Sequence, residues 1–403
     1  MKRGKWTRLL MVAAPLLIGF GAGCGDFWQA PATTTTTGTC TTNCTTATGG
    51  DFYILNAGTT PQIVGETIVT GTLTAISGSP WALEGTPYSM AIAPNGDFLV
   101  VSTTSGVFAY PIANGALGTA VVVSTDQAFA VQVDATDSWL IEAIAGTAGV
   151  TFGAVPIDST TGANNGVEQN VSFTVTNASV QPGRMVISQD NLNIFVALGA
   201  GGTIVVPFNA RVTAGSNPLA TKATTIAVAN AGGSALSVAV DQSTTPRLFY
   251  IGETLADSAG TSGGLRVFNY SSLGTTTLTQ ATGSPIASGG LAPNFILPIA
   301  SGEYVYVANG TGSSTAGNIT GFGITSNGAT TPTYTVTTDT ATAAGVQPIG
   351  MAEDSTSTFV FAVGSLGSPF FDAYIFDATT LGQLDSQITS TTSSGSIGIV
   401  AAP

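Results

Sequence analysis

The segment PYSMAIAPNGDFLVV, residues 87–101, contains two short apolar runs separated by Pro-Asn-Gly-Asp. Apolar runs interrupted in this way predict two antiparallel strands joined by a tight turn. The pattern recurs as AFAVQVDATDSWLIEAI (128–144), RMVISQDNLNIFVAL (184–198), ALSVAVDQSTTPRLFYIG (235–252), NFILPIASGEYVYVAN (294–309) and IGMAEDSTSTFVFAVG (349–364). The hairpin is therefore one copy of a repeated unit.

Each copy continues beyond the hairpin. A third strand is predicted at 106–112, 153–158, 203–209, 265–270, 319–324 and 373–377. A weaker fourth strand follows a further turn, as at 118–124. Equivalent first-strand positions lie 41 to 58 residues apart, at Met90, Val131, Met185, Val238, Ile296 and Met351. Four short strands in a repeat of this length are typical of a β-propeller blade.

The two ends of the chain supply one further unit. Residues 395–403 look like a lone first strand, whereas 51–58, 62–69 and 72–76 look like second, third and fourth strands without a first. We therefore predict an all-β fold over 51–403, a seven-bladed β-propeller with four-stranded antiparallel blades. Its last blade is closed by the N- and C-terminal segments. A parallel β-helix, with coils of roughly 20 residues, and an outer-membrane barrel, with ~10-residue strands, fit the pattern less well.

The first 50 residues differ from the repeats and predict export. Residues 1–23 begin with basic side chains and continue into an apolar stretch that is short for a spanning helix, as in a signal peptide. Small residues before Cys24 resemble a bacterial lipobox, although Gly21 replaces the usual leucine, so ordinary cleavage and an uncleaved anchor stay open as alternatives. We expect 24–50 to be a Thr-rich, lipid-anchored tether, in which Cys40 and Cys44 could form a disulfide. The expected location is periplasmic or on the cell surface, as a membrane-anchored lipoprotein.

The charge content limits the partners and the chemistry. Charged residues make up 8% of the chain, against ~25% in an average soluble protein. Beyond Arg8, five basic residues stand against 22 acidic ones, which argues against nucleic acid as a partner. The chain has no histidine, the side chain most used for acid–base catalysis and metal ligation. We expect neither a metal site nor a cofactor.

Three stretches resemble the repeats of a known propeller family; they are 87–101, FAYPIANGALG (108–118) and YVYVANG (304–310). The family is that of the lactonase-type propellers, which includes bacterial 6-phosphogluconolactonase and fungal muconate-cyclising enzymes. The same stretches also resemble the YVTN-repeat propellers of exported and surface proteins. The resemblance extends over residues 51–403. It is specific for the propeller fold and unspecific for the activity.

Enzymes of this family carry Gly-Pro-Arg-His where a first strand enters the central cleft. The matching positions here read TPYS (86–89), QPGR (181–184), APNF (292–295) and QPIG (347–350). All four lack the histidine, and Arg184 is the one basic residue among them. A phosphorylated substrate would need several arginines or lysines. The resemblance therefore leaves Arg184 as the candidate for holding a carboxylate or a sugar oxygen.

Other candidate side chains lie near the second strands and the turns. A carboxylate pair there could perform acid–base chemistry as in glycosidases; the candidates are Glu142, Glu253 and Glu303. Aspartates at the hairpin turns fit ordinary turn chemistry; they are Asp97, Asp190 and Asp241. No calcium-loop motif of alternating aspartates occurs. Aromatic residues that alternate with small ones are interpreted as packing between blades; they are Tyr53, Trp81, Tyr88, Phe98, Tyr110, Trp139, Phe195 and Phe208.

The sequence favours a non-enzymatic function. We expect an exported, membrane-tethered propeller that binds an unknown protein or polysaccharide at the cell envelope. The alternative is a lactonase-like hydrolase that acts on a non-phosphorylated lactone or sugar substrate through carboxylates and Arg184. The missing histidine favours the binding module, whereas the family resemblance favours the hydrolase.

Overall fold

The computed structural model describes residues 48–403, except 177–179, 214, 242, 244–246, 272–276, 311–316, 326–332, 343–346, 378–379 and 392–393. The expected signal peptide, most of the tether and the cysteines Cys24, Cys40 and Cys44 lie outside the described residues. The residues that are described contain β-strands and no α-helix. None of them therefore forms a helix with the length and apolarity that crossing a membrane requires.

The strands form seven antiparallel sheets, which we call blades 1 to 7. Blade 1 contains β5 (Pro87–Ile92), β6 (Phe98–Thr103), β7 (Gly106–Ala113), β8 (Ala116–Leu117) and β9 (Val121–Ser124). Blade 2 contains β10 (Ala128–Val133), β11 (Trp139–Gly146), β12 (Gly149–Pro156) and β13 (Gln169–Thr174). Blade 3 contains β14 (Met185–Ile187), β15 (Asn193–Ala197), β16 (Thr203–Pro207) and β17 (Thr224–Ile226). Each of these blades is thus built from one stretch of the chain.

The remaining blades follow the same order. Blade 4 contains β18 (Ala235–Asp241), β19 (Arg247–Glu253), β20 (Gly264–Ser271), β21 (Thr277–Gln280) and β22 (Ile286–Ala287). Blade 5 contains β23 (Pro293–Pro298), β24 (Tyr304–Asn309), β25 (Asn318–Thr325) and β26 (Thr333–Thr342). Blade 6 contains β27 (Pro348–Glu353), β28 (Val360–Gly364), β29 (Phe371–Phe376) and β30 (Leu384–Ser390). Blade 7 joins β31 (Ser396–Ala401) to β1 (Asp51–Asn56), β2 (Gln62–Val69), β3 (Thr72–Ala75) and β4 (Trp81–Ala82).

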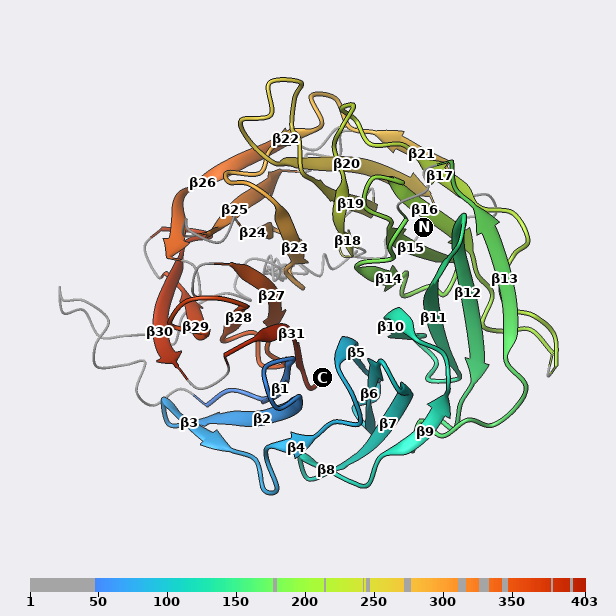
Figure 1. Cartoon of the computed structure of the whole chain (residues 1–403). Helices are drawn as coiled ribbons and strands as arrows, with labels where there is room; N and C mark the ends of the chain where they lie inside the picture. Colours follow the sequence, from blue (N-terminus) through green and yellow to red (C-terminus); the bar gives the residue numbers. More distant parts are fainter. Residues whose placement is uncertain are drawn as a thin grey trace, which may run out of the picture. The chain divides into compact units, whose positions relative to one another are not determined.

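The first strands of the seven blades surround the central axis of the propeller, and we call the region they enclose the central channel. Figure 1 shows β5, β10, β14, β18, β23, β27 and β31 innermost, with the later strands of each blade farther out. Neighbouring inner strands contact each other around the full circle, and β31 contacts β5 to complete it. The predicted seven-bladed β-propeller is therefore confirmed.

The last blade is closed by both ends of the described chain, as predicted. β31 pairs antiparallel with β1 from Phe52↔Ala401 to Asn56↔Ser396. Backbone hydrogen bonds from Ala57 N to the Gly395 carbonyl and from Ala402 N to the Asp51 carbonyl extend the pairing by one residue on each side. Because β31 supplies the first strand of blade 7, β1 is not left with an unpaired edge.

The core lies between the blades, since each blade packs its two faces on its neighbours. Second strands are buried on both faces, which explains the continuous apolar runs of β6 and β28. The outer strand β13 instead alternates half-buried and exposed residues. Aromatic pairs bridge adjacent blades: Phe195 and Phe249 stack with ring centroids 4.3 Å apart, and Phe52 and Phe361 form a tilted pair with centroids 4.4 Å apart. These contacts agree with the predicted packing role of the aromatic residues.

A β-bulge at the start of the inner strands shapes the channel entrance. Six of the seven inner strands shift register at the same point, with the extra residue at Tyr88, Phe129, Leu236, Asn294, Ile349 and Ile397. All six are half-buried, although the residues on either side are mostly buried. A bulge redirects a side chain away from the regular sheet. We infer that these residues surround the channel at the end where the inner strands begin.

Candidate functional site

Arg184 lies at this entrance, directly before β14 of blade 3. Gly183 N donates to the Ala197 carbonyl at 2.8 Å, and Ala197 N donates to the Arg184 carbonyl at 3.0 Å. Gly183 and Arg184 therefore both lie opposite Ala197, as in a β-bulge. Gly183 therefore occupies the position that a side-chain-bearing residue fills in the other inner strands. The Arg184 side chain follows at the next position, on the wall of the channel.

The Arg184 side chain crosses the channel to three other blades. Its Nη2 donates to the carbonyl oxygens of Ile349 in blade 6 and of Ile397 in blade 7, the latter at 3.3 Å. The guanidinium carbon lies 4.9 Å from the ring centroid of Phe295 in blade 5, a cation–π contact. Blade 5 is two positions from blade 3 around the ring, and blades 6 and 7 are three positions away. A side chain that contacts all three of these blades must lie inside the channel.

The charge of Arg184 has no acidic counterpart among the described residues. The ion pairs found there are Arg247–Asp190 and Arg266–Glu253. Desolvation lowers the pKa of Arg184 to about 10, so the side chain is still cationic at neutral pH. Carbonyl dipoles and an aromatic face stabilise this charge only in part. Because the cation is desolvated, it attracts an anion that enters the site more strongly than it would in water. Both hydrogen bonds use Nη2, which leaves Nη1 and Nε for a ligand.

The bulge positions of the other blades carry aromatic, aliphatic and amide side chains. Tyr88 and Phe129 at the entrances of blades 1 and 2 have ring centroids 4.7 Å apart. Asn294 uses its amide to donate to the Pro348 carbonyl at 3.1 Å, which ties blade 5 to blade 6. One fixed cation among such side chains suits a small ligand that carries few charges.

The glutamates named as candidates for a carboxylate pair lie in blades 2, 4 and 5. Glu142 lies on β11 in blade 2, and Glu253 lies at the end of β19 in blade 4. Glu253 is engaged there by Arg266 at 3.2 Å and by the backbone N–H of Ala229 at 3.0 Å. Glu303 is exposed in the turn before β24. The three candidate glutamates therefore lie in three different blades and at different positions along their strands.

The three turn aspartates have the contacts of turn residues. Asp97 N donates to the Asn95 side chain at 2.9 Å, and Asp241 accepts from Ser243 N at 2.9 Å. Asp190 accepts from Leu192 N at 3.2 Å and also pairs with Arg247 of the next blade. These side chains stabilise hairpins rather than offer a site.

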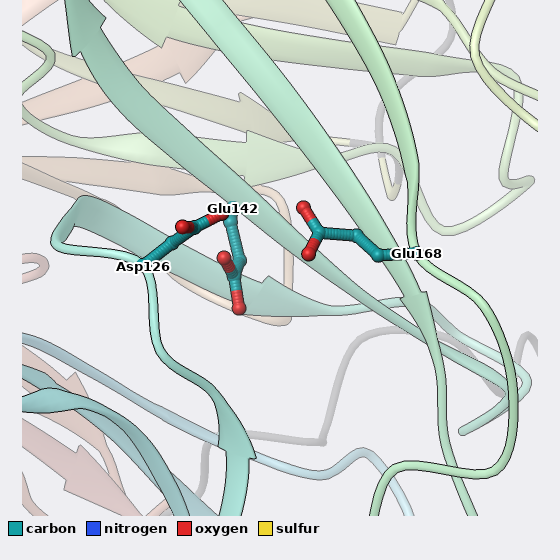
Figure 2. A group of neighbouring side chains, drawn as sticks. All are labelled: Asp126, Glu142 and Glu168. Atoms are coloured by element: carbon teal, nitrogen blue, oxygen red, sulfur yellow. The ribbon is translucent and has the colours of Figure 1, made fainter.

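A second group of polar side chains lies between blades 1 and 2. Asp126, Glu142 and Glu168 each place one carboxylate oxygen so that the three oxygens lie within 4.8 Å of one another. Figure 2 shows Asp126 and Glu168 on either side of Glu142. Burial, followed by the charges of Glu168 and Asp126, raises the pKa of Glu142 to about 8, while a hydrogen bond from Ser124 opposes the shift. Burial likewise raises the pKa of Glu168.

The sequence did not predict this cluster. Its members come from a link between blades, a second strand and the approach to an outer strand, with no motif spacing. The one available signal was Glu142 itself, a carboxylate within a second-strand run that is apolar in the other copies.

A surface hollow of about 400 Å³ carries no comparable chemistry. It lies along the outer strands of blades 2 and 3 and is lined by small apolar residues and threonines, such as Val175, Ala200 and Thr225. The channel entrance and the carboxylate cluster are therefore the two sites that can be argued from the described residues.

Solved structures with the same architecture include lactonases. A periplasmic gluconolactonase from Pseudomonas aeruginosa superposes with a TM-score of 0.63 at 16% identity, covering 88% of this chain and 99% of the other. A Bacteroides uniformis protein provisionally named 6-phosphogluconolactonase gives 0.64 at 17% identity, covering 87% and 98%. These likenesses establish the fold. No protein-family model matches the sequence, and no curated protein is detectably similar to it.

Proposed function

We propose that this propeller is a lactonase-like hydrolase that opens a non-phosphorylated lactone at the channel entrance. The observation that carries the proposal is the Arg184 guanidinium, which is fixed inside the channel and has no carboxylate partner among the described residues. A cation held in this way is preorganised for negative charge that develops on a substrate.

Lactone hydrolysis develops negative charge at one oxygen. Water attacks the carbonyl carbon, the carbonyl oxygen becomes an oxyanion, and the ring C–O bond then breaks as the ring oxygen gains a proton. The product is a hydroxy acid, which releases its proton to solvent and becomes a carboxylate. Arg184 Nη1 can donate to the oxyanion and then to the product carboxylate, since Nη2 is held by Ile349 and Ile397.

The small number of unpaired basic side chains favours a substrate without a phosphate group. The other described basic residues are paired with carboxylates, as Arg247 and Arg266 are, or exposed, as Arg211 and Lys222 are. One guanidinium is too little for a phosphate and suits an uncharged lactone. The gluconolactonase among the structural neighbours, itself named as periplasmic, supports this substrate class and is compatible with export.

A binding function without turnover is the second candidate. It is supported by the groups that contact Arg184, which are two carbonyl oxygens and an aromatic ring. None of these groups can act as a general base and take a proton from water. In that case Arg184 would hold the carboxylate of an acidic sugar or another small acid, and the propeller would present it without cleaving it.

The test is hydrolysis of a panel of sugar and aliphatic lactones by the purified full chain. Arg184→Gln removes the charge, Arg184→Lys keeps the charge without the planar fork, and Arg211→Gln is a control at an exposed arginine. We expect turnover above the uncatalysed rate, reduced roughly 10²–10³-fold in kcat by Arg184→Gln and unchanged by Arg211→Gln. No turnover by a folded wild type, or equal turnover by all variants, would overturn the proposal.

We further propose that the chain is exported and anchored through a lipid on Cys24. The support is the sequence of residues 1–24, with its basic start, short apolar stretch and small residues before the cysteine. A tethered propeller of this kind would meet extracellular or periplasmic lactones.

A further inference from the structure

The carboxylate cluster between blades 1 and 2 draws on three separate elements. Asp126 lies in the link from β9 to β10, Glu142 lies in the middle of β11, and Glu168 directly precedes β13. Asp126 and Glu168 are half-buried, whereas Glu142 is 0% exposed. Three carboxylates this close repel one another when ionised, so something must offset their charge if they are to remain together.

Glu142 occupies a position that is apolar in every other blade. It pairs with Val131 of the inner strand. The second-strand residues at the same register position are Val101, Val196, Ile251, Val307, Ala362 and Ile54. All of these six are buried core residues or belong to a fully buried strand. A carboxylate here replaces an interface methyl group, a change that costs free energy unless the carboxylate is compensated.

Two buried oxygen atoms of the cluster have no hydrogen-bond partner. Glu142 Oε2 accepts from the Ser124 hydroxyl at 3.2 Å, and that hydroxyl accepts from Asp126 N at 3.0 Å. Glu142 Oε1 and Glu168 Oε1 are buried and accept from no donor. Buried acceptors without donors point to a ligand, because a buried polar atom normally has a partner.

A glycine lets the Glu168 carboxylate lie close against the sheet beside Glu142. Gly153 on β12 pairs with Glu142 across the sheet, and a Cβ added to it would overlap Glu168 Oε1. At the same register position in blade 4 lies Arg266, opposite Ile251, and its guanidinium neutralises Glu253 at 3.2 Å. Blade 4 thus has an ion pair between Arg266 and Glu253 in this region. Blade 2 has Gly153 in place of the arginine, and its carboxylates have no such cation.

We propose that Asp126, Glu142 and Glu168 bind one calcium ion between blades 1 and 2. Carboxylate and hydroxyl oxygens are the ligands of a hard divalent cation, and Ser124 adds a hydroxyl beside the three carboxylates. The three carboxylate oxygens lie within 4.8 Å of one another, close enough for one ion to bind all three after small side-chain movements. Ca²⁺ accepts the irregular geometry of such a site, whereas Mg²⁺ requires nearly ideal octahedral geometry at shorter distances. The ion would join two blades and replace the cation that Arg266 provides in blade 4.

Calcium binding is measured by titration calorimetry on the purified full chain after removal of divalent ions with EDTA. CaCl₂ and MgCl₂ are titrated separately at pH 7.5. Glu142→Gln keeps the shape of the side chain and removes its charge. Asp126→Asn, at a half-buried loop residue, is the second variant in case the buried one does not fold. Glu303→Gln is the matched control, since Glu303 is an exposed glutamate outside the cluster.

We expect one Ca²⁺ per chain, at least tenfold weaker binding in Glu142→Gln and in Asp126→Asn, and unchanged binding in Glu303→Gln. Calcium should also raise the melting temperature of the wild type more than that of either cluster variant. Absence of Ca²⁺ binding, or equal binding by all variants, would overturn the site. Mg²⁺ binding as tight as Ca²⁺ binding would overturn the assignment of the ion.

Discussion

Glu142→Gln should make the stability of the propeller less dependent on pH when divalent ions are chelated. Burial and the neighbouring carboxylates raise the pKa of Glu142 from 4.5 to about 8 in the folded chain. Between these values the unfolded chain releases this proton while the folded chain retains it, so ionisation stabilises the unfolded state. The wild type should therefore lose stability as pH rises from about 4.5 to about 8, and glutamine cannot contribute to that loss.

The size of the effect follows from the same two pKa values. At 1.36 kcal/mol for each pH unit, the interval from 4.5 to about 8 corresponds to an upper limit of roughly 5 kcal/mol. Glu168, whose pKa is also raised by burial, remains in the variant and keeps part of the slope. Over the interval from pH 5 to pH 8 the same factor gives at most about 4 kcal/mol, so we expect the two proteins to differ by roughly 2–4 kcal/mol more at pH 8 than at pH 5, with the variant favoured at pH 8.

The assay is urea unfolding at pH 5, 6.5 and 8 in EDTA, followed by circular dichroism and tryptophan fluorescence. With excess Ca²⁺ the wild-type loss at high pH should shrink, because the ion binds the ionised carboxylates. Parallel stability curves for wild type and variant in EDTA would refute the reasoning, since they would mean that Glu142 ionises as easily in the fold as outside it.

Three further perturbations have direct readouts. Asp134→Ala should cost about 3–5 kcal/mol in urea unfolding, because its carboxylate accepts from Ser138 N, Trp139 N and the Asn191 amide at 2.7–2.8 Å; a loss under 1 kcal/mol contradicts this. Removing residues 396–403 deletes β31 and should abolish cooperative unfolding, measured by calorimetry, whereas a retained sharp transition would argue against closure by the C-terminus. Cys24→Ser should abolish incorporation of labelled palmitate in a bacterial host, and labelling that persists would exclude lipidation at that residue.

The fold could be predicted from the sequence because each blade repeats the same local chemistry. The hairpin at 87–101 and its copies specify strands and turns by themselves, and seven blades follow from counting copies and leftovers at the two ends. Even the closing pair of β1 and β31 was predictable, since each end lacked what the other supplied.

The sites could be predicted only in part, since their contacts join distant repeats. The sequence placed Arg184 at a strand entrance, but its partners Ile349 and Ile397 follow 165 and 213 residues later. Likewise, Glu142 was recognisable as a carboxylate, whereas its true neighbours Asp126 and Glu168 are set by how blade 2 packs on blade 1. A repeat pattern specifies which residues are equivalent and not which of them touch across the ring.

The channel site is tested most directly by binding of D-gluconate, a hydroxy acid of the expected product class, to the purified full chain. Titration calorimetry on wild type, Arg184→Gln and Arg211→Gln isolates the contribution of the channel guanidinium. A charge-assisted hydrogen bond contributes about 1.5–3 kcal/mol, so we predict binding roughly 10- to 100-fold weaker in Arg184→Gln and unchanged in Arg211→Gln. Equal affinity in all three proteins, or no binding by the wild type, would contradict the proposal that Arg184 anchors the ligand in the channel.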